Sequence, residues 1–211
     1  MKQVLSFAIV MLTGLGIFIQ SRHSENKAGD STEGYQLGDQ VADFKLSGVD
    51  GASHSLSDYY RQGAEGVIVI FTCNTCPVSR RNEDRIIALH QKTSTLGFPV
   101  VAINTNDPEK SSGDDFAAMQ ARASDKSYPF DYLQDMTQEV GKSFGAAHTP
   151  QAFLLDKEQR VRYMGAIDDS PYNAANASQH FIEDAVNHLK QGTMPDPAIT
   201  KSIGCSIKYR T

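Results

Sequence analysis

The chain has 211 residues, of which 40% are hydrophobic, and this is enough to build one compact domain with its own core. There are 20 basic and 25 acidic residues, giving a formal net charge of -5. Because the balance is mildly acidic and the basic residues are scattered, the composition gives no electrostatic basis for binding nucleic acid. We therefore expect a globular protein with other partners.

The N-terminal segment differs from the rest of the chain. Lys2 precedes a largely apolar run from Val4 to Ile19, and a polar stretch from Gln20 to Glu33 follows. A positive residue before a short apolar run is typical of a secretory signal peptide or signal anchor. We predict such a segment over residues 1–21 and a flexible linker over 22–34. The protein is then exported, and is periplasmic or membrane-anchored on the extracytoplasmic side. Whether the segment is cleaved stays open.

Short apolar runs predict strands. The runs 67–71, 99–103 and 152–155 are apolar without alternation, which is typical of strands covered on both faces. Residues 161–165 predict a last strand, antiparallel to the one before it, because the turn 156–159 is too short for a crossover. The segment 42–46 and the Asp50-Gly51 turn predict an N-terminal β-hairpin.

Helical periodicity fills the gaps between these strands. We predict a long helix over 77–96, stopped at Gly97, and a second around Phe116, Met119 and Ala123. A short helix over 140–144 ends at Gly145, and a final one over 181–189 is closed by Lys190 and Gly192. The predicted fold class is α/β, with a mixed central sheet and helices on both faces. The domain spans 35–192, and a C-terminal tail, 193–211, contains Cys205.

A pair of cysteines marks the candidate site. Cys73 and Cys76 lie where the strand 67–71 ends and the long helix begins, and Pro77 follows them. Two cysteines with two residues between them at such a point are typical of a redox pair. A helix N-terminus stabilises a thiolate, which is the attacking species in disulfide exchange. A static disulfide or half of a metal site are the alternatives, but no second Cys-x-x-Cys or His-x-x-x-His completes a zinc site.

The position of Pro77 bears on which cysteine attacks. Proline suits the first residue of a helix, where its missing N–H would be unpaired anyway. Cys76 then becomes the N-cap residue, nearest the positive end of the helix dipole. We therefore favour Cys76 over Cys73 as the thiolate of lower pKa. Trapping a mixed disulfide in each single cysteine variant decides between them.

The layout resembles the thioredoxin superfamily, in particular the redoxin branch related to alkyl hydroperoxide reductase and thiol-specific antioxidant proteins. The resemblance runs from about residue 37 to 189, with a motif beyond it. The matching segments are Phe-Thr-Cys-Asn-Thr-Cys-Pro (71–77), Val-Ala-Ile-Asn-Thr-Asn-Asp (101–107), Gly-Ala-Ala-His-Thr-Pro (145–150), Tyr-Met-Gly-Ala-Ile-Asp-Asp (163–169) and Gly-Cys-Ser-Ile-Lys (204–208). It implies a thioredoxin-like fold, antioxidant or disulfide-exchange chemistry and no cofactor.

The resemblance also implies a cis peptide at Thr149-Pro150, beside the cysteines. A cis proline there would leave the neighbouring backbone open to pair with an extended substrate. Thr149 and Pro150 are therefore expected to bind the substrate. The implied partners are protein thiols and disulfides, with electrons supplied by a membrane or periplasmic donor.

The chain departs from the family in several places. It has no tryptophan, and the strand 67–71 contains no acid, so the group that relays protons is not identified. Peroxiredoxins, the nearest rival enzymes, carry proline seven residues and threonine three residues before their reactive cysteine. For Cys76 those positions hold Val69 and Cys73, which argues against peroxidase activity.

A copper-binding chaperone on the same fold is a rival from another class. Two thiolates and the imidazole of His148 would suit copper, although such chaperones place three residues between their cysteines rather than two. Our interpretation includes no metal ligand. Cys205 is the odd thiol: it is either a third redox partner, a thiol that pairs between chains, or an inert residue of a docked tail.

Overall fold

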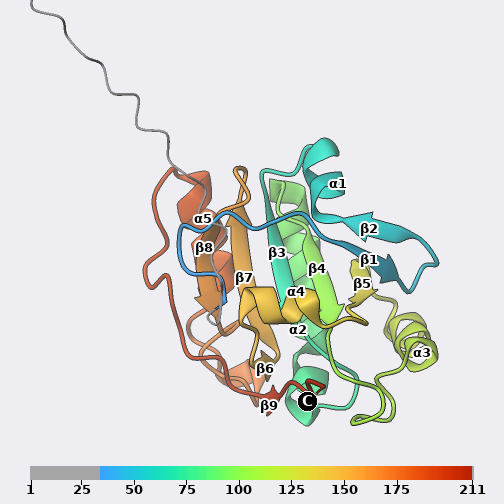
Figure 1. Cartoon of the computed structure of the whole chain (residues 1–211). Coiled ribbons are helices and arrows are strands. Elements are labelled where there is room, and N and C mark those ends of the chain that lie inside the picture. The colour runs from blue at the N-terminus through green and yellow to red at the C-terminus, as the bar shows by residue number, and fades with distance from the viewer. Residues whose placement is uncertain (1–33, 211) are drawn as a thin grey trace, which may run out of the picture. The chain divides into compact units, whose positions relative to one another are not determined.

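The hydrophobic runs of the sequence form the centre of a sheet. A computed structural model describes residues 34–210, and in it β3 (Gly66–Phe71) lies between β4 (Val100–Asn104) and β7 (Gln151–Asp156) (Figure 1). Every residue of β3 and β4 is buried, as expected for strands covered on both faces. The other strands of this sheet are β1 (Lys45–Gly48), β2 (Ser53–Ser55), β5 (Asp131–Gln134) and β8 (Val161–Gly165), in the order β2-β1-β5-β4-β3-β7-β8.

The sheet is mixed. Strands β3, β4 and β5 run parallel, whereas β7 pairs antiparallel with β3 and β8 antiparallel with β7. The hairpin β1–β2 joins the other side of the sheet through an antiparallel pairing of β1 with β5. Because β3 and β4 are parallel, their carboxyl ends meet at one edge, which is where open α/β sheets place their ligand sites.

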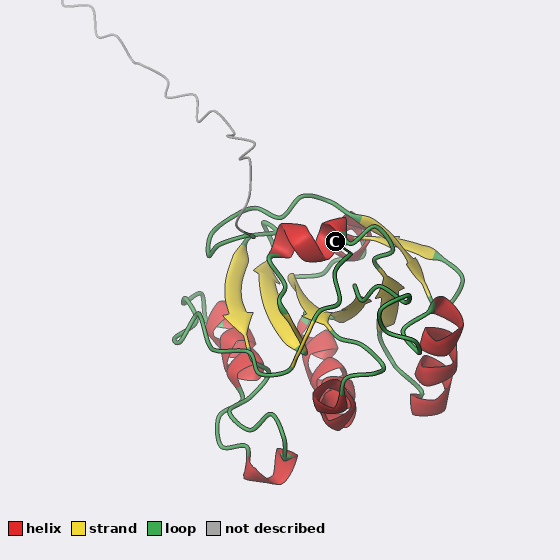
Figure 2. Cartoon of the chain, turned by 60° about the horizontal axis from the view of Figure 1, so that its bottom comes forward, coloured by secondary structure: helices red, strands yellow, loops and turns green. Residues whose placement is uncertain are grey.

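Helices cover both faces of the sheet (Figure 2). Helices α2 (Pro77–Thr93), α3 (Phe116–Lys126) and α5 (Phe181–Lys190) pack on the face that carries Ile68 and Ile70. Helices α1 (Leu56–Arg61) and α4 (Glu139–Phe144) pack on the face that carries Val69 and Phe71. Successive side chains of β3 thus supply two separate hydrophobic cores, and the predicted thioredoxin-like architecture is confirmed.

The structure confirms the predicted helices and the N-terminal hairpin, with small shifts in their bounds. The long helix ends at Thr93 and continues as a 3₁₀ turn, Ser94–Leu96, before Gly97 adopts a φ of 87° that favours glycine. The hairpin strands are β1 and β2 rather than residues 42–46, and the turn glycine, Gly51, also has a positive φ.

Three strands were not predicted from the sequence. β5 begins with Asp131 and ends with Gln134, so it carries no apolar run to signal it. β6 (His148–Thr149) and β9 (Cys205–Ser206) have two residues each and pair only with each other, in a separate small sheet. The expectation that residues 161–165 form the last strand was therefore wrong, because a two-residue strand has no periodicity to detect.

The predicted signal segment and almost all of the predicted linker fall on residues 1–33, outside the described residues. Within residues 34–210, no helix has the length and hydrophobicity that a membrane crossing requires.

Phe144 ties α4 to the sheet. Its buried ring packs edge-on against Tyr35, Phe71 and Phe153, with centroids 5.2, 5.3 and 5.1 Å away. We expect Phe144→Ala to lower the free energy of unfolding by about 3–5 kcal/mol, since it removes a fully buried aromatic side chain. Urea denaturation measures this. Tyr172→Ala, at an exposed aromatic residue, is the control and should change the value by less than about 0.5 kcal/mol. Equal effects of the two substitutions would contradict the prediction.

Candidate active site

The two cysteines lie at the carboxyl end of β3. Cys73 belongs to the turn after this strand, and Cys76 is the N-cap residue of α2, whose first residue is Pro77. The backbone N–H of Ser79 donates to Cys76 Sγ at 3.5 Å. The helix start predicted from Pro77 is thus confirmed, and both cysteines are buried free thiols.

Thr149 contacts both sulfur atoms. Its hydroxyl oxygen lies 3.2 Å from Cys73 Sγ, and its carbonyl oxygen lies 3.2 Å from Cys76 Sγ. The peptide bond between Thr149 and Pro150 is cis, as the family resemblance implies. The structure therefore brings Cys73, Cys76, Thr149 and Pro150 together, although they are more than 70 residues apart in the chain.

Cys76 is the sulfur that holds negative charge best. A hydrogen bond from the Cys73 thiol is the largest cause that lowers the pKa of Cys76, to about 4, and it acts against the cost of burial. The Cys205 thiol, the Ser79 N–H and the Cys205 N–H stabilise the thiolate further. These donors outweigh the single Thr149 carbonyl, which favours the thiol form.

Cys73 is held in the opposite state. Its hydrogen bond to Cys76 is the largest cause that raises the pKa of Cys73, and burial and the negative charge of Asp114 raise it further. The two sulfurs thus share one proton, which stays on Cys73 while Cys76 is charged.

Asp114 is a buried carboxylate beside the cysteine loop. Its oxygens accept hydrogen bonds from the Asn74 N–H at 2.7 Å and from the Thr75 hydroxyl at 2.7 Å, so they fix both residues between the cysteines. The side chains of Ser111 and Asn106 donate to the same carboxylate at 2.6 and 2.8 Å. A fully buried anion with this many donors is rigidly placed, and it sets the conformation of the loop.

Sequence reasoning missed Asp114. The strand 67–71 contains no acid, and Asp114 lies in a loop 38 residues after Cys76, outside any apolar or helical pattern. The available signal was the polar run Asn-Thr-Asn-Asp, 104–107, at the end of a buried strand, since the side chains of Asn104 and Asn106 donate to the Asp114 carboxylate.

Cys205 lies beside Cys76, although the sequence leaves its position open. It pairs with Thr149 in the small sheet formed by β6 and β9. Its sulfur also lies near the backbone of Val78, in the first turn of α2. Burial is the main cause that raises the pKa of Cys205 to about 11, and the neighbouring Cys76 adds to it.

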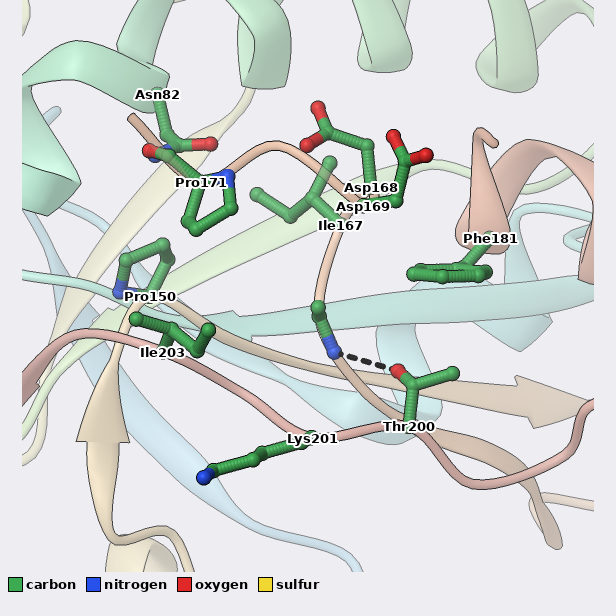
Figure 3. Close-up of a pocket in the computed structure, with 11 residues that line it drawn as sticks. Asn82, Pro150, Ile167, Asp168, Asp169, Pro171, Phe181, Thr200, Lys201 and Ile203 are labelled. Atoms are coloured by element: carbon green, nitrogen blue, oxygen red, sulfur yellow. Dashed lines mark hydrogen bonds between the residues drawn. The ribbon is translucent and has the colours of Figure 1, made fainter. Parts of the chain in front are cut away.

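A cavity of about 260 Å³ adjoins Pro150 (Figure 3). Pro150, Ile167, Phe181 and Ile203 give it an apolar lining, and Asp168 lies at its wall. This carboxylate is paired with Arg85 at 2.5 Å, so it has a structural role. The cavity is large enough for one side chain of a bound peptide.

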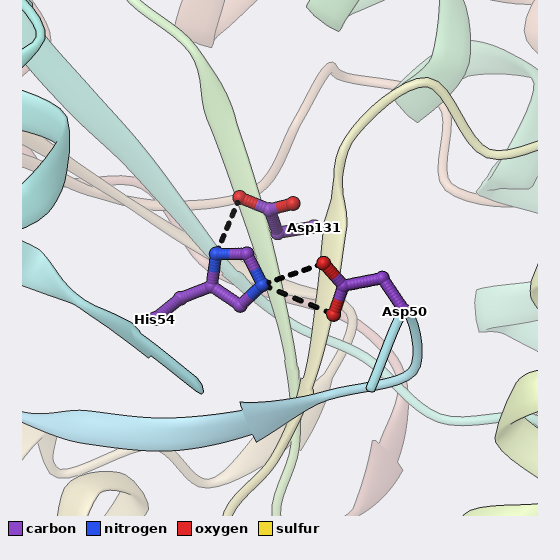
Figure 4. Close-up of side chains that lie close together, drawn as sticks. All are labelled: Asp50, His54 and Asp131. Carbon is purple, nitrogen blue, oxygen red and sulfur yellow. Dashed lines mark hydrogen bonds and ion pairs between the residues drawn. The ribbon is translucent and has the colours of Figure 1, made fainter. Parts of the chain in front are cut away.

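His148 and His54 are two histidines whose rings contact polar side chains. The His148 ring forms a hydrogen bond with the Ser202 hydroxyl at 3.3 Å. His54 lies between two carboxylates, with its ring nitrogens 3.0 Å from Asp50 and 3.4 Å from Asp131 (Figure 4). Within residues 34–210, this is the one group of three close potential metal ligands, and it contains no cysteine.

The charge on Cys76 can be measured by its absorbance. Reduced protein should show one thiolate absorbance at 240 nm that persists as the pH falls and disappears around pH 4, because the pKa of Cys76 is depressed. Cys73→Ala should move this transition to higher pH, since it removes the strongest hydrogen-bond donor. Cys76→Ser should abolish the transition. A wild-type protein with no thiolate below pH 7 would refute the assignment.

The second prediction concerns Asp114. Asp114→Asn removes a buried negative charge near Cys73, so the pKa of Cys73 should fall. It also breaks part of a buried hydrogen-bond network, which should cost about 1–3 kcal/mol of stability. Titration of ¹³C-labelled Cys73 by NMR measures the first effect. Asp115→Asn is the control, because Asp115 only caps α3 through the Ala118 N–H and asparagine caps equally well. An unchanged Cys73 titration in Asp114→Asn would overturn the electrostatic role.

The chain is similar in sequence to a named oxidoreductase and in structure to two solved proteins that cover most of its length. The thiol-disulfide oxidoreductase ResA of Geobacillus thermodenitrificans is 23% identical over 154 residues, which cover 73% of this chain and 80% of that protein. Among solved structures, an uncharacterized conserved protein from Geobacillus kaustophilus has a TM-score of 0.76 at 36% identity, covering 83% of this chain and 93% of that one. A hypothetical protein from Sinorhizobium meliloti 1021 has a TM-score of 0.78 at 30% identity, covering 85% and 97%.

The sequence profile of the AhpC/TSA family matches residues 37–164, from the segment before the hairpin to the end of β8. This stretch includes both cysteines, Asp114 and the Thr149-Pro150 pair, and it ends before the tail that carries Cys205. The protein is a member of the AhpC/TSA family, on the thioredoxin-like fold.

Proposed function

We propose that this protein is a thiol–disulfide oxidoreductase that exchanges disulfides with protein partners through Cys73 and Cys76. The observation that carries the proposal is the position of Cys76, which caps α2 and accepts a hydrogen bond from the second thiol of the pair. The similarity to ResA, a protein named for this activity, supports it. The protein is accordingly an oxidoreductase with protein thiols and disulfides as substrates.

The chemistry follows from how the proton is shared. The Cys76 thiolate attacks one sulfur of a partner disulfide, whose S–S bond breaks as the other partner sulfur leaves as a thiolate. The Cys76 charge disappears in the mixed disulfide, and with it the main cause of the raised Cys73 pKa. Cys73 then loses its proton and attacks Cys76 Sγ, so the Cys73–Cys76 bond forms and the bond between Cys76 and the partner breaks. The partner sulfur leaves as a thiolate and takes up the proton that Cys73 lost, which releases the reduced partner. The reverse sequence oxidises a partner dithiol.

Two sites beside the cysteines suit an extended partner. The backbone at Thr149 lies next to both sulfurs, and the cavity lined by Pro150 and Phe181 adjoins it. An extended segment that pairs with a strand edge gains affinity from its main chain and specificity from side-chain pockets. We propose that Thr149 and Pro150 bind the partner in this way.

The peroxidase alternative lacks its activating groups. The positions seven and three residues before Cys76 are Val69, which is buried in β3, and Cys73. A hydroxyl would be needed beside the reactive sulfur, yet the Thr149 hydroxyl contacts Cys73 rather than Cys76. Turnover of hydrogen peroxide by purified protein at rates that exceed its disulfide exchange would favour the alternative.

The apolar run from Val4 to Ile19 supports export, to the periplasm or to an extracytoplasmic membrane-anchored position. In such an oxidising compartment, a reducing role requires a membrane or periplasmic electron donor. The antioxidant role implied by the family resemblance would then act through repair of oxidised thiols.

The reduction potential of the Cys73–Cys76 pair tests the proposal and its direction. A thiolate stabilised at the helix N-terminus stabilises the reduced form, so we expect a potential above the ~-270 mV of thioredoxin and toward the ~-120 mV of a strong oxidant. Equilibration with glutathione buffers, followed by alkylation and mass spectrometry, measures it.

An insulin disulfide reduction assay on cysteine variants tests the roles of the two sulfurs. Cys76→Ser should lose all activity, and Cys73→Ser/Cys205→Ser, in which Cys76 is the one remaining cysteine, should accumulate a mixed disulfide at Cys76. Activity retained in Cys76→Ser, or failure of Cys73 and Cys76 to form a disulfide under mild oxidant, would refute the proposed function.

A further inference from the structure

The C-terminal segment of the chain covers the active site. β9 (Cys205–Ser206) pairs antiparallel with β6 (His148–Thr149), and Cys205 is the residue directly opposite Thr149 (Figure 1). The pairing continues with a hydrogen bond from the Ile207 N–H to the Ala147 carbonyl at 3.0 Å. The backbone edge that the sequence analysis expected to be open for a substrate is therefore occupied by the chain itself.

This segment is firmly docked. The Ile207 side chain is buried in the core that contains Phe144. Lys208 forms two main-chain hydrogen bonds with the loop after β4: its N–H donates to the Asn106 side chain at 2.8 Å, and its carbonyl accepts from the Asp107 N–H at 2.9 Å. These contacts hold the residues directly after Cys205, and so they fix the position of its thiol.

The approach of the segment to Thr149 is close. A Cβ atom added at Gly204 would lie 2.1 Å from the Thr149 carbonyl oxygen, a distance that no side chain can occupy. That same carbonyl oxygen lies 3.2 Å from Cys76 Sγ. Glycine at position 204 therefore lets the strand approach as closely as a bound peptide would, with a cysteine as the next residue.

Cys76 is the sulfur that both other thiols approach. The side chains of Cys73 and Cys205 both lie close enough to Cys76 to lower the pKa of its thiol. The Cys205 sulfur in turn interacts with the Val78 N–H at the start of α2. Cys205 thus has the position that the cysteine of a partner would take when it forms a mixed disulfide with Cys76.

We propose that the C-terminal segment is an internal substrate analogue, and that Cys205 is a third redox thiol which exchanges with the Cys73–Cys76 disulfide. The proposal rests on the proposed function of that pair. The Cys205 thiolate attacks Cys76 Sγ, so the Cys76–Cys205 bond forms and the Cys73–Cys76 bond breaks. Cys73 leaves as a thiolate and takes up the proton that Cys205 lost. No electrons enter or leave the protein, so this step needs no external oxidant.

Two consequences follow for partners. An extended partner segment must displace β9 before it can pair with Thr149, because both use the same strand edge. A Cys76–Cys205 disulfide fixes β9 in place and keeps the attacking sulfur out of reach. The tail therefore makes access to Cys76 dependent on its own redox state.

The covalent step is tested in Cys73→Ser, which leaves Cys76 and Cys205 as its thiols. Treatment with oxidised glutathione should give a monomer with an intramolecular Cys76–Cys205 disulfide, because Cys205 displaces glutathione from Cys76. Mass spectrometry of the tryptic peptides identifies the bond. The Cys73→Ser/Cys205→Ser variant is the control and should retain glutathione on Cys76. Stable glutathione on Cys76 in Cys73→Ser itself, or disulfides only between chains, would overturn the proposal.

Wild-type protein in the same experiment separates this inference from the proposed function. A reversible Cys73–Cys76 disulfide in the wild type, without a Cys76–Cys205 bond in Cys73→Ser, would leave the oxidoreductase intact and reject the third thiol. Failure of the Cys73–Cys76 bond to form would reject the function itself.

The occupied strand edge is tested with Gly204→Val, whose side chain would collide with the Thr149 carbonyl and release β9. A tail docked about nine-tenths of the time raises the apparent KM for a competing substrate about tenfold, so its release should lower KM for insulin by a similar factor. Alkylation of Cys205 by N-ethylmaleimide should become faster. Ser206→Val is the matched control, because Ser206 is exposed and valine suits a strand. An unchanged KM together with unchanged alkylation in a folded Gly204→Val protein would overturn the proposal.

Discussion

The chemistry that we propose for this protein depends on one contact, between the sulfur of Cys76 and the first turn of α2. The N–H groups of that turn have no partner within the helix, and Cys76 Sγ accepts from one of them while it caps the helix. Because β3 is buried on both sides, the strand places this sulfur at a fixed point on the sheet edge. The packing of β3 therefore determines where a negative charge can be held.

Burial disfavours charge on both sulfurs, and the surrounding groups decide which of the two is the thiolate. Asp114 lies fully buried beside the loop, and its carboxylate accepts hydrogen bonds from the main-chain N–H of Asn74 and from the side-chain hydroxyl of Thr75. Its negative charge acts against ionisation of Cys73 and leaves the thiolate to Cys76. The same carboxylate thus fixes the conformation of the loop and helps to raise the pKa of Cys73. This buried acid lies in the loop before α3, whereas the strand that precedes the cysteines, β3, contains no acid.

The segment that faces the two cysteines is Thr149, and its backbone pairs with β9. Thr149 contacts Cys73 with its hydroxyl and Cys76 with its carbonyl, and β9 completes the pairing on its open side. A strand edge with an unpaired backbone invites pairing by any extended segment. Here the chain supplies that segment from its own C-terminus, so the edge is covered until a competing strand displaces it. By the mechanism we propose, the covered edge restricts access to Cys76 until a partner segment displaces β9.

The α/β fold, the central strands and the role of Cys76 as helix cap can be predicted from the sequence, because they depend on local patterns. Apolar runs mark strands buried on both faces, and Pro77 fixes the first residue of α2. The approach of Asp114 to Asn74 and that of Cys205 to Cys76 become visible only in the folded chain. Both contacts join segments far apart in the chain, and neither Asp114 nor the two-residue strands β6 and β9 lie in a periodic pattern. Their positions are set by how the buried sheet brings its edges and loops together, which no short stretch of sequence encodes.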